Sequence, residues 1–189
     1  MTESIIRCPW CGDDPLYVRY HDEEWGIPVH EDATLFEFLT LEWAQAGLSW
    51  ITVLRKRENY RKHFHDWNIE KIANMSDAEL EKILLDPWVI RNRLKVYSVR
   101  KNAQVAREIQ KEFGSLDAYF WNSGQEFPQI HHPKTMNDLT SESDTSKTLS
   151  KDLKKRGMTF VGSTIIYAFM QAVGMFDDHI KSCFRKEKS

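Results

Sequence analysis

The sequence predicts an all-α fold, and three observations support this expectation. Apolar residues recur at helical spacing along most of the 189 residues, strand-like alternation over four or more residues is nearly absent, and glycines stand where the periodic segments end. The length suits one compact domain over residues 1–189. No heptad run indicates a dimer, so we expect a monomer.

The elements follow in order from this periodicity. Residues 8–33 are rich in Asp, Glu, Pro, Gly and aromatic side chains and are expected to form an irregular arm. Leu35 to Ala46 predicts a helix that stops at Gly47, and 123–143 predicts a polar loop. We expect further helices over 50–64 after Ser49, from the Ser76–Glu79 capping box to Pro87, and over 90–113, 115–122, 145–156 and 163–173. A last helix is expected to start near Asp177 and to hold His179 and Cys183.

Composition narrows the class of protein. Seven tryptophans are many for this length, so some of these rings are expected to line a pocket. The net charge of −2 gives no general sign of nucleic-acid binding, although basic residues cluster over 147–156. The start MTESIIRCPW lacks an apolar segment of useful length, and no run of about 18 apolar residues occurs. We therefore expect a cytoplasmic protein with no membrane association and with reduced thiols.

Cysteines and histidines near the two ends suggest a metal site. His179 and Cys183 are four residues apart and would share one face of a helix. Cys8 and His21 could complete a set of two Cys and two His, which a structural zinc ion accepts in tetrahedral geometry. Cys8 and Cys11 also form a CxxC pair, so the residues alone leave open whether His21 or Cys11 is the ligand.

Glu42 stands out because it lies in an apolar helical stretch. A buried carboxyl group is costly unless it is partnered, so it either bonds a backbone amide or an arginine, or it serves a site.

Four blocks of sequence resemble the bacterial 3-methyladenine DNA glycosylase I family, from about residue 8 to residue 183. They are Tyr17–Gly26 (YVRYHDEEWG) followed by Pro28, Leu41–Trp50 (LEWAQAGLSW), Leu153–Gly162 (LKKRGMTFVG) and Tyr167–Gly174 (YAFMQAVG). The resemblance implies a helix-hairpin-helix glycosylase fold and one structural zinc ion per chain. It implies the ligands Cys8, His21, His179 and Cys183, and so favours His21 over Cys11.

The resemblance also implies an activity. A glycosylase of this family removes 3-methyladenine from double-stranded alkylated DNA and releases the free base. By position, Glu42 would recognise the base, with Trp50 and Tyr20 stacking on it and Tyr17 and Trp25 lining the same pocket. Such a cationic purine needs aromatic faces and a hydrogen-bond acceptor, and it must be flipped out of the duplex.

The resemblance places a hairpin between two helices over about 145–173. It would hold the DNA backbone through backbone amides, with the tight geometry from Gly157 and Gly162 and charge from Lys154, Lys155 and Arg156. We therefore expect the basic run over 147–156 to contact DNA, in a manner sensitive to salt.

Asp177 is, with Glu42, a candidate catalytic carboxyl group, because many superfamily members carry an aspartate just after the hairpin helix. Capping of the last helix is the other role left open for Asp177. The FVGSTI segment carries no lysine for a Schiff base, so a monofunctional enzyme that leaves an abasic site is expected. The rival interpretations are a non-enzymatic zinc-containing DNA-binding module, an enzyme of this fold acting on another purine, and a helical interaction domain.

Overall fold

The computed structural model describes residues 5–123 and 125–186 and is helical throughout most of this range. Residues 1–4, 124 and 187–189 lie outside the described residues. The first four belong to the N-terminal stretch in which no targeting segment was expected, and residue 124 belongs to the expected loop. The elements in chain order are η1 Pro9–Cys11, α1 Pro15–Glu23, α2 Asp32–Gln45, α3 Trp50–Leu54, α4 Arg57–His63, η2 His65–Trp67, α5 Ile69–Ala73, α6 Asp77–Ile83, α7 Arg93–Phe113, α8 Leu116–Trp121, β1 Gln129–Ile130, η3 Met136–Asp138, α9 Asp144–Lys155, α10 Ser163–Ala172 and β2 Phe176–Asp177.

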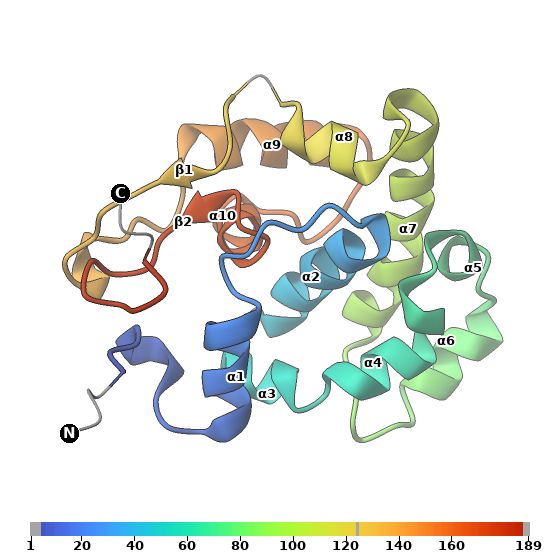
Figure 1. Ribbon diagram of the computed structural model, residues 1–189. Helices are drawn as coiled ribbons and strands as arrows, with labels where there is room; N and C mark the ends of the chain where they lie inside the picture. Colours follow the sequence, from blue (N-terminus) through green and yellow to red (C-terminus); the bar gives the residue numbers. More distant parts are fainter. Residues whose placement is uncertain (1–4, 124, 187–189) are drawn as a thin grey trace.

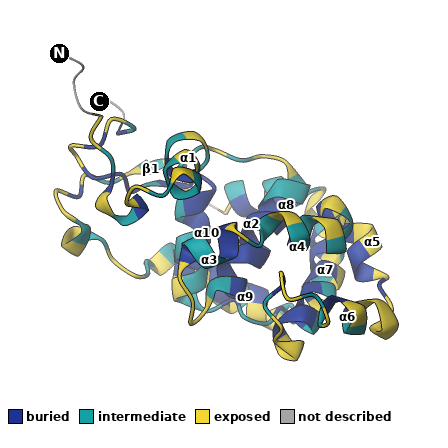
Figure 2. Ribbon diagram, turned by 90° about the horizontal axis from the view of Figure 1, so that it is seen from below, coloured by how far each residue is buried: buried dark blue, intermediate teal, exposed yellow. Residues whose placement is uncertain are grey.

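Helix α2 lies at the centre, and the other elements surround it (Figure 1). Every residue from Leu35 to Ala44 is buried, because α2 is covered by α7, α8 and α10 on different sides. A helix that is apolar on all faces belongs in a core. Figure 2 shows the buried residues gathered in this centre and the exposed ones on the outer helices.

The expected helix boundaries are confirmed where local signals are strong. The Ser76–Glu79 capping box begins α6, with both reciprocal hydrogen bonds present. Gly114 ends α7 with φ of 90°, a conformation that glycine adopts without steric cost. Helices α2, α8, α9 and α10 also agree with the expected ranges within a few residues.

Three expectations in the first half of the chain were wrong. The arm over 8–33 contains helix α1, which begins because Asp14 accepts hydrogen bonds from the backbone of Leu16 and Tyr17 and Pro15 occupies its first turn. The helix expected over 50–64 is two short helices, α3 and α4. Helix α7 begins at Arg93 instead of residue 90, because the Asn92 side chain caps it. The short elements η2 and α5 were not expected.

The last expected helix is also wrong. Asp177 lies in β2, which pairs in parallel with β1 through Phe176 and Gln129, and residues 178–186 are irregular, with turns and bends from residue 181. Backbone hydrogen bonds of Lys181 to Pro133 and of Phe184 to Ile6 hold this segment. These partners are remote in sequence, so the tertiary structure overrides the local periodicity. No helix within residues 5–123 and 125–186 is long and apolar enough to span a membrane.

Candidate active site and metal centre

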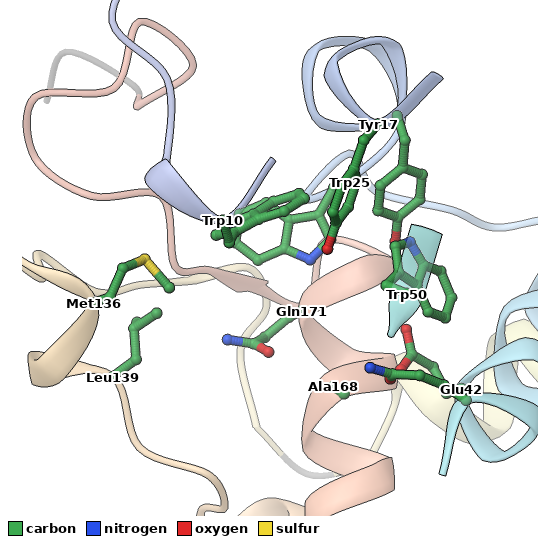
Figure 3. Close-up of a pocket in the computed structure, with 11 residues that line it drawn as sticks. Trp10, Tyr17, Trp25, Glu42, Trp50, Met136, Leu139, Ala168 and Gln171 are labelled. Carbon is green, nitrogen blue, oxygen red and sulfur yellow. The ribbon is translucent and has the colours of Figure 1, made fainter. Parts of the chain in front are cut away.

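An aromatic pocket lies between α1, α2, α3 and α10 (Figure 3). The cavity measures about 200 Å³. It contains every expected substrate-binding residue and also residues that the sequence did not suggest. Its lining is Trp10, Tyr17, Tyr20, Trp25, Glu42, Gln45, Trp50, Met136, Leu139, Ala168 and Gln171.

The rings pack on one another and leave their remaining faces to the pocket. Trp10 lies 5.1 Å from Tyr17 and 5.0 Å from Trp25 between ring centroids. Tyr20 lies 5.3 Å from Trp50. Rings fixed by such contacts offer a preformed surface for a flat ligand.

Helix α2 carries two buried carboxyl groups with opposite surroundings. Glu37 accepts hydrogen bonds from Arg57 at 2.8 Å and from Arg61 at 3.1 Å. It therefore forms structural ion pairs with both arginines. Glu42 is only 6% exposed, and among the described residues no group hydrogen-bonds its side chain. The interpretation of Glu42 as a carboxyl group satisfied by an amide or an arginine is therefore wrong.

Burial sets the protonation of Glu42. Desolvation raises the pKa of its carboxyl group from 4.5 to about 8, so Glu42 is a neutral acid near pH 7. Trp50 Nε1, in the same pocket, is a second buried polar atom without a partner in the described part of the chain. The pocket wall thus contains a carboxyl group and a buried indole N–H, neither with a partner among the described residues.

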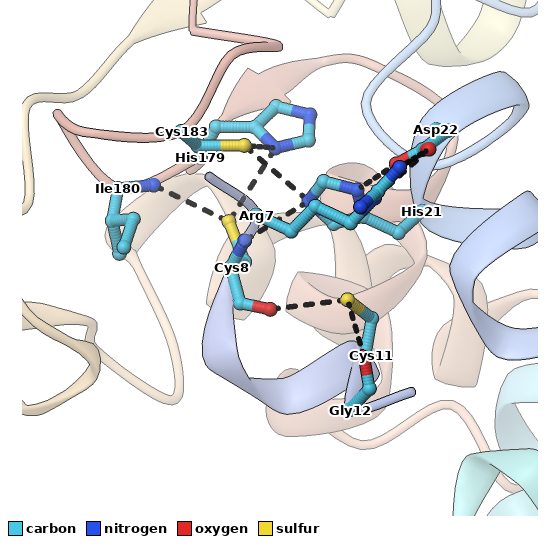
Figure 4. Close-up of polar contacts among 9 residues, drawn as sticks. All are labelled: Arg7, Cys8, Cys11, Gly12, His21, Asp22, His179, Ile180 and Cys183. Carbon is cyan, nitrogen blue, oxygen red and sulfur yellow. Dashed lines mark hydrogen bonds and ion pairs between the residues drawn. The ribbon is translucent and has the colours of Figure 1, made fainter. Parts of the chain in front are cut away.

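A second site lies behind the aromatic wall. Cys8, His21, His179 and Cys183 are all buried, and one ligand atom from each lies within 4.8 Å of the others (Figure 4). Cys183 Sγ is 3.4 Å from His21 Nε2 and 3.6 Å from His179 Nδ1, and Cys8 Sγ is 3.5 Å from His179 Nδ1. A tetrahedral site with zinc-like bond lengths has edges of roughly 3.3–3.8 Å, so this group fits a metal ion.

The surroundings of this Cys/His group favour metal ligation. Asp22 bonds His21 Nδ1 at 2.7 Å and leaves Nε2 toward the cluster. Burial lowers the pKa of His179 to about 4, which keeps the imidazole neutral as a ligand must be. Burial raises the pKa of the Cys8 thiol to about 12, so a cation is needed to hold the thiolate. Cys11 Sγ instead donates to Cys8 O at 3.2 Å and lies outside the group.

The geometric reason given from sequence for pairing His179 with Cys183 was wrong. These residues do not share a helix face, because the segment that carries them is not helical. The close approach comes from the way residues 178–186 fold back on the N-terminal arm.

Helices α9 and α10 form the expected pair joined by a short connector. Asn102 of α7 holds the connector, because its amide donates to Thr159 O at 2.9 Å and accepts from Thr159 N at 2.9 Å. Gly157 has φ of 101° and so requires glycine. Gly162 has φ of −63°, which any residue adopts, so the expected conformational role of Gly162 is wrong.

The basic residues of the hairpin differ in their surroundings. Lys154 and Lys155 are exposed. Arg156 pairs with Asp152 at 2.7 Å and with Glu112 at 2.6 Å. Two carboxylates therefore already engage the Arg156 guanidinium.

Asp177 does not line the aromatic pocket. Its carboxylate accepts a hydrogen bond from His179 N at 3.1 Å and pairs with Lys186 at 3.0 Å. It therefore caps a turn and not a helix. The catalytic role expected for it stays a prediction.

Sequence reasoning missed Trp10 and Gln171 of the pocket. Trp10 lies inside the CxxC motif, where the two cysteines give the stronger signal. Gln171 carried the same signal as Glu42, a polar residue in an otherwise apolar helix.

The fold and the two sites define a mostly helical protein with an aromatic pocket and a Cys/His group able to hold a metal ion. The family model of methyladenine glycosylases matches residues 10–186, and the chain belongs to this family. The sequence is 42% identical to DNA-3-methyladenine glycosylase 1 of Escherichia coli (strain K12) over 177 residues, which is 94% of this chain and 95% of the relative.

Solved structures of the same family show the same fold. A crystal structure of a 3-methyladenine DNA glycosylase I, 43% identical, superposes with a TM-score of 0.91 and covers 96% of this chain and all of that one. The Staphylococcus aureus 3-methyladenine DNA glycosylase I, described with the structural basis of its 3-methyladenine recognition, is 34% identical with a TM-score of 0.92 and covers 97% of each chain. The resemblance first seen in four sequence blocks is confirmed.

Proposed function

We propose that this chain is a DNA repair glycosylase that hydrolyses the N-glycosidic bond of 3-methyladenine in alkylated double-stranded DNA and leaves an abasic site. The observation that carries the proposal is Glu42, a buried carboxyl group without a partner in the described structure, at the wall of an aromatic pocket. The names of the relatives and their 3-methyladenine recognition support it.

The chemistry suits this pocket. 3-Methyladenine is cationic while attached to the sugar, so it is already a good leaving group and needs little protonation. The enzyme's task is to flip the nucleotide out of the duplex and to bind the cationic ring better than a neutral one. Tyr20 and Trp50 supply ring faces for stacking and cation–π attraction, with Tyr17 and Trp25 beside them.

Glu42 makes binding in the pocket depend on the charge of the base. A cation that enters stabilises the carboxylate form and lowers the pKa of Glu42, so binding releases a proton near neutral pH. The resulting carboxylate accepts a hydrogen bond from the exocyclic amine. A neutral normal base offers no such charge and leaves the carboxyl group protonated.

The helix-hairpin-helix over α9 and α10 holds the DNA backbone in this proposal. Its connector is fixed by Asn102 and turned by Gly157, and Lys154 and Lys155 are exposed beside it. Their charges attract phosphates without reading sequence. Arg156, also expected to contact DNA, would have to do so while paired with Glu112 and Asp152.

The metal of the Cys/His group is zinc in this proposal, with a structural role. Two thiolates and two imidazoles at tetrahedral spacing are a donor set that zinc prefers. It would join the N-terminal arm to the last described segment. All four candidate ligands come from the protein, so no position is left open for a reacting water.

The bacterial relatives and the proposed DNA substrate support a cytoplasmic enzyme that acts on nucleoid DNA. A monomer stays a prediction. Incubation of the pure chain with methylated duplex DNA tests the activity and the single-function mechanism together. We expect free base and intact strands; DNA binding without base release would favour the zinc-containing DNA-binding module, and strand cleavage would contradict a monofunctional enzyme.

A further inference from the structure

Gln171 of α10 faces the pocket, with Glu42 on the other side (Figure 3). It is half-buried and is not among the residues expected from the sequence. Ala168, one turn earlier on the same helix, also lines the pocket, so this face of α10 forms its wall. A polar side chain in this position can bind the ligand directly.

The orientation of the Gln171 amide is fixed by a buried neighbour. Its Nε2 donates to Asp178 Oδ2 at 2.6 Å. A carboxylate accepts hydrogen bonds and cannot donate them, so the amide nitrogen and not the amide oxygen must face Asp178. The Gln171 carbonyl oxygen is therefore left for the pocket, and within the described residues no donor bonds it.

Asp178 is itself held firmly. Its side chain is fully buried, Oδ2 also accepts from the Tyr167 hydroxyl at 2.7 Å, and Oδ1 bonds His131 Nδ1 at 2.6 Å. Three partners on one buried carboxylate leave it a single orientation. The Gln171 amide cannot turn over without losing a hydrogen bond to this carboxylate.

We propose that Gln171 is a specificity-determining residue of the base pocket and that Asp178 is the positioning residue that aims it; this rests on the proposed function. The Gln171 oxygen is an acceptor only. A purine with an amine at C6 offers it a donor, whereas a guanine-type base carries a carbonyl oxygen at C6, which cannot donate and leaves the Gln171 oxygen unsatisfied. The pocket therefore selects alkylated adenine over alkylated guanine.

The first test compares the wild type with Gln171→Met, which keeps the side-chain length and removes the acceptor. Duplex DNA treated with a methylating agent supplies 3-methyladenine and methylated guanines together. We expect 3-methyladenine release under single-turnover conditions to slow about tenfold, with release of methylated guanine unchanged or faster. An unchanged ratio of the two released bases would overturn the proposal.

A second readout separates this proposal from the proposed function. Free 3-methyladenine is titrated into both proteins by calorimetry, without DNA. We expect the Gln171→Met protein to bind the free base about tenfold more weakly. If the wild type binds the base but releases none from DNA, the glycosylase function fails and Gln171 is still tested; equal affinity of the two proteins overturns the inference.

The positioning role of Asp178 is tested through the ratio of released 3-methyladenine to released methylated guanine. Asp178→Leu keeps the volume and removes the acceptor, so it should lower the ratio of released bases as Gln171→Met does. Asp178→Asn keeps an oxygen that can accept from Gln171, so its ratio should be close to that of the wild type. Tyr60→Phe is the matched control, since it removes a hydrogen bond from Ile90 N that lies outside the pocket lining and should leave the ratio unchanged. An equal fall in Tyr60→Phe would reduce Asp178 to a structural role.

Discussion

The indole of Trp25 meets the imidazole of His179 edge to face, with ring centroids 4.6 Å apart. Trp25 lines the base pocket and His179 belongs to the Cys/His group, so one contact joins the two sites. Trp10 makes a parallel connection, 5.2 Å from the His21 ring. The Cys/His group therefore supports the rear of the pocket's aromatic wall as well as the chain ends.

Cys183→Ser should therefore affect both sites. We expect the metal content to fall from about one ion per chain to none, and the free energy of unfolding to fall by about 3 kcal/mol or more. Because the wall loses its support, binding of free 3-methyladenine should weaken too. Metal analysis, thermal unfolding and calorimetry check these points. Cys11→Ser is the control and should keep its metal; metal loss there would place Cys11 among the ligands.

The pH dependence of stability should report Glu42. Its pKa is about 8 in the folded protein and near 4.5 when unfolded, so between these values the folded state binds the extra proton. This stabilisation is complete below about pH 4.5 and is lost as pH rises toward 8, a change on the order of a few kcal/mol. Glu42→Gln should remove this slope in urea unfolding and be more stable than the wild type at pH 8.5. The exposed Glu23→Gln should keep it; a slope unaltered by Glu42→Gln would show that Glu42 is ionised.

Asn102 should affect DNA binding, because it holds the connector between α9 and α10. Asn102→Ala removes both hydrogen bonds to Thr159 and should lower the free energy of unfolding by about 1–3 kcal/mol. Affinity for undamaged duplex should fall as well, measured by fluorescence anisotropy at fixed salt. Gln104→Ala, which removes a hydrogen bond from α7 to Ala73 O, is the control. It should lose stability and keep DNA affinity, and equal loss in both variants would contradict a role for the connector.

The role of Asp177 is decided by Asp177→Asn. A catalytic carboxylate predicts a loss of about 100-fold or more in single-turnover base release. Its bonds to His179 N and Lys186, and its position outside the pocket lining, favour a structural role. We therefore expect a rate within a few-fold of the wild type; a 100-fold fall would establish the catalytic role.

Local signals in the sequence were enough for the central helices. The apolar periodicity and the glycine stops correctly predicted α2, α10 and the C-terminal end of α7, because each of these helices buries a long apolar face. The same reasoning identified Glu42 as out of place in its helix. Gln171 was missed although it breaks the pattern of α10 in the same way.

Long-range contacts explain the failures. The irregular segment over 178–186 is held by Pro133 and Ile6, which no local pattern connects to it. Helix α1 was hidden because its aromatic and charged composition serves the pocket and the Cys/His group more than the core. The approach of Cys8 to His179 likewise depends on the whole fold; the residue types suggested a shared metal site, and the family resemblance favoured His21 over Cys11 as its fourth ligand.

The most direct test of the central claim measures the bases released from methylated duplex DNA by the wild type and by Glu42→Ala, separated by chromatography. A functional Glu42 pocket predicts 3-methyladenine among the products of the wild type and a release at least about 100-fold slower from a folded Glu42→Ala protein. Release of 3-methyladenine at equal rates by both proteins would contradict the role given to Glu42, and no release by the wild type would contradict the proposed activity.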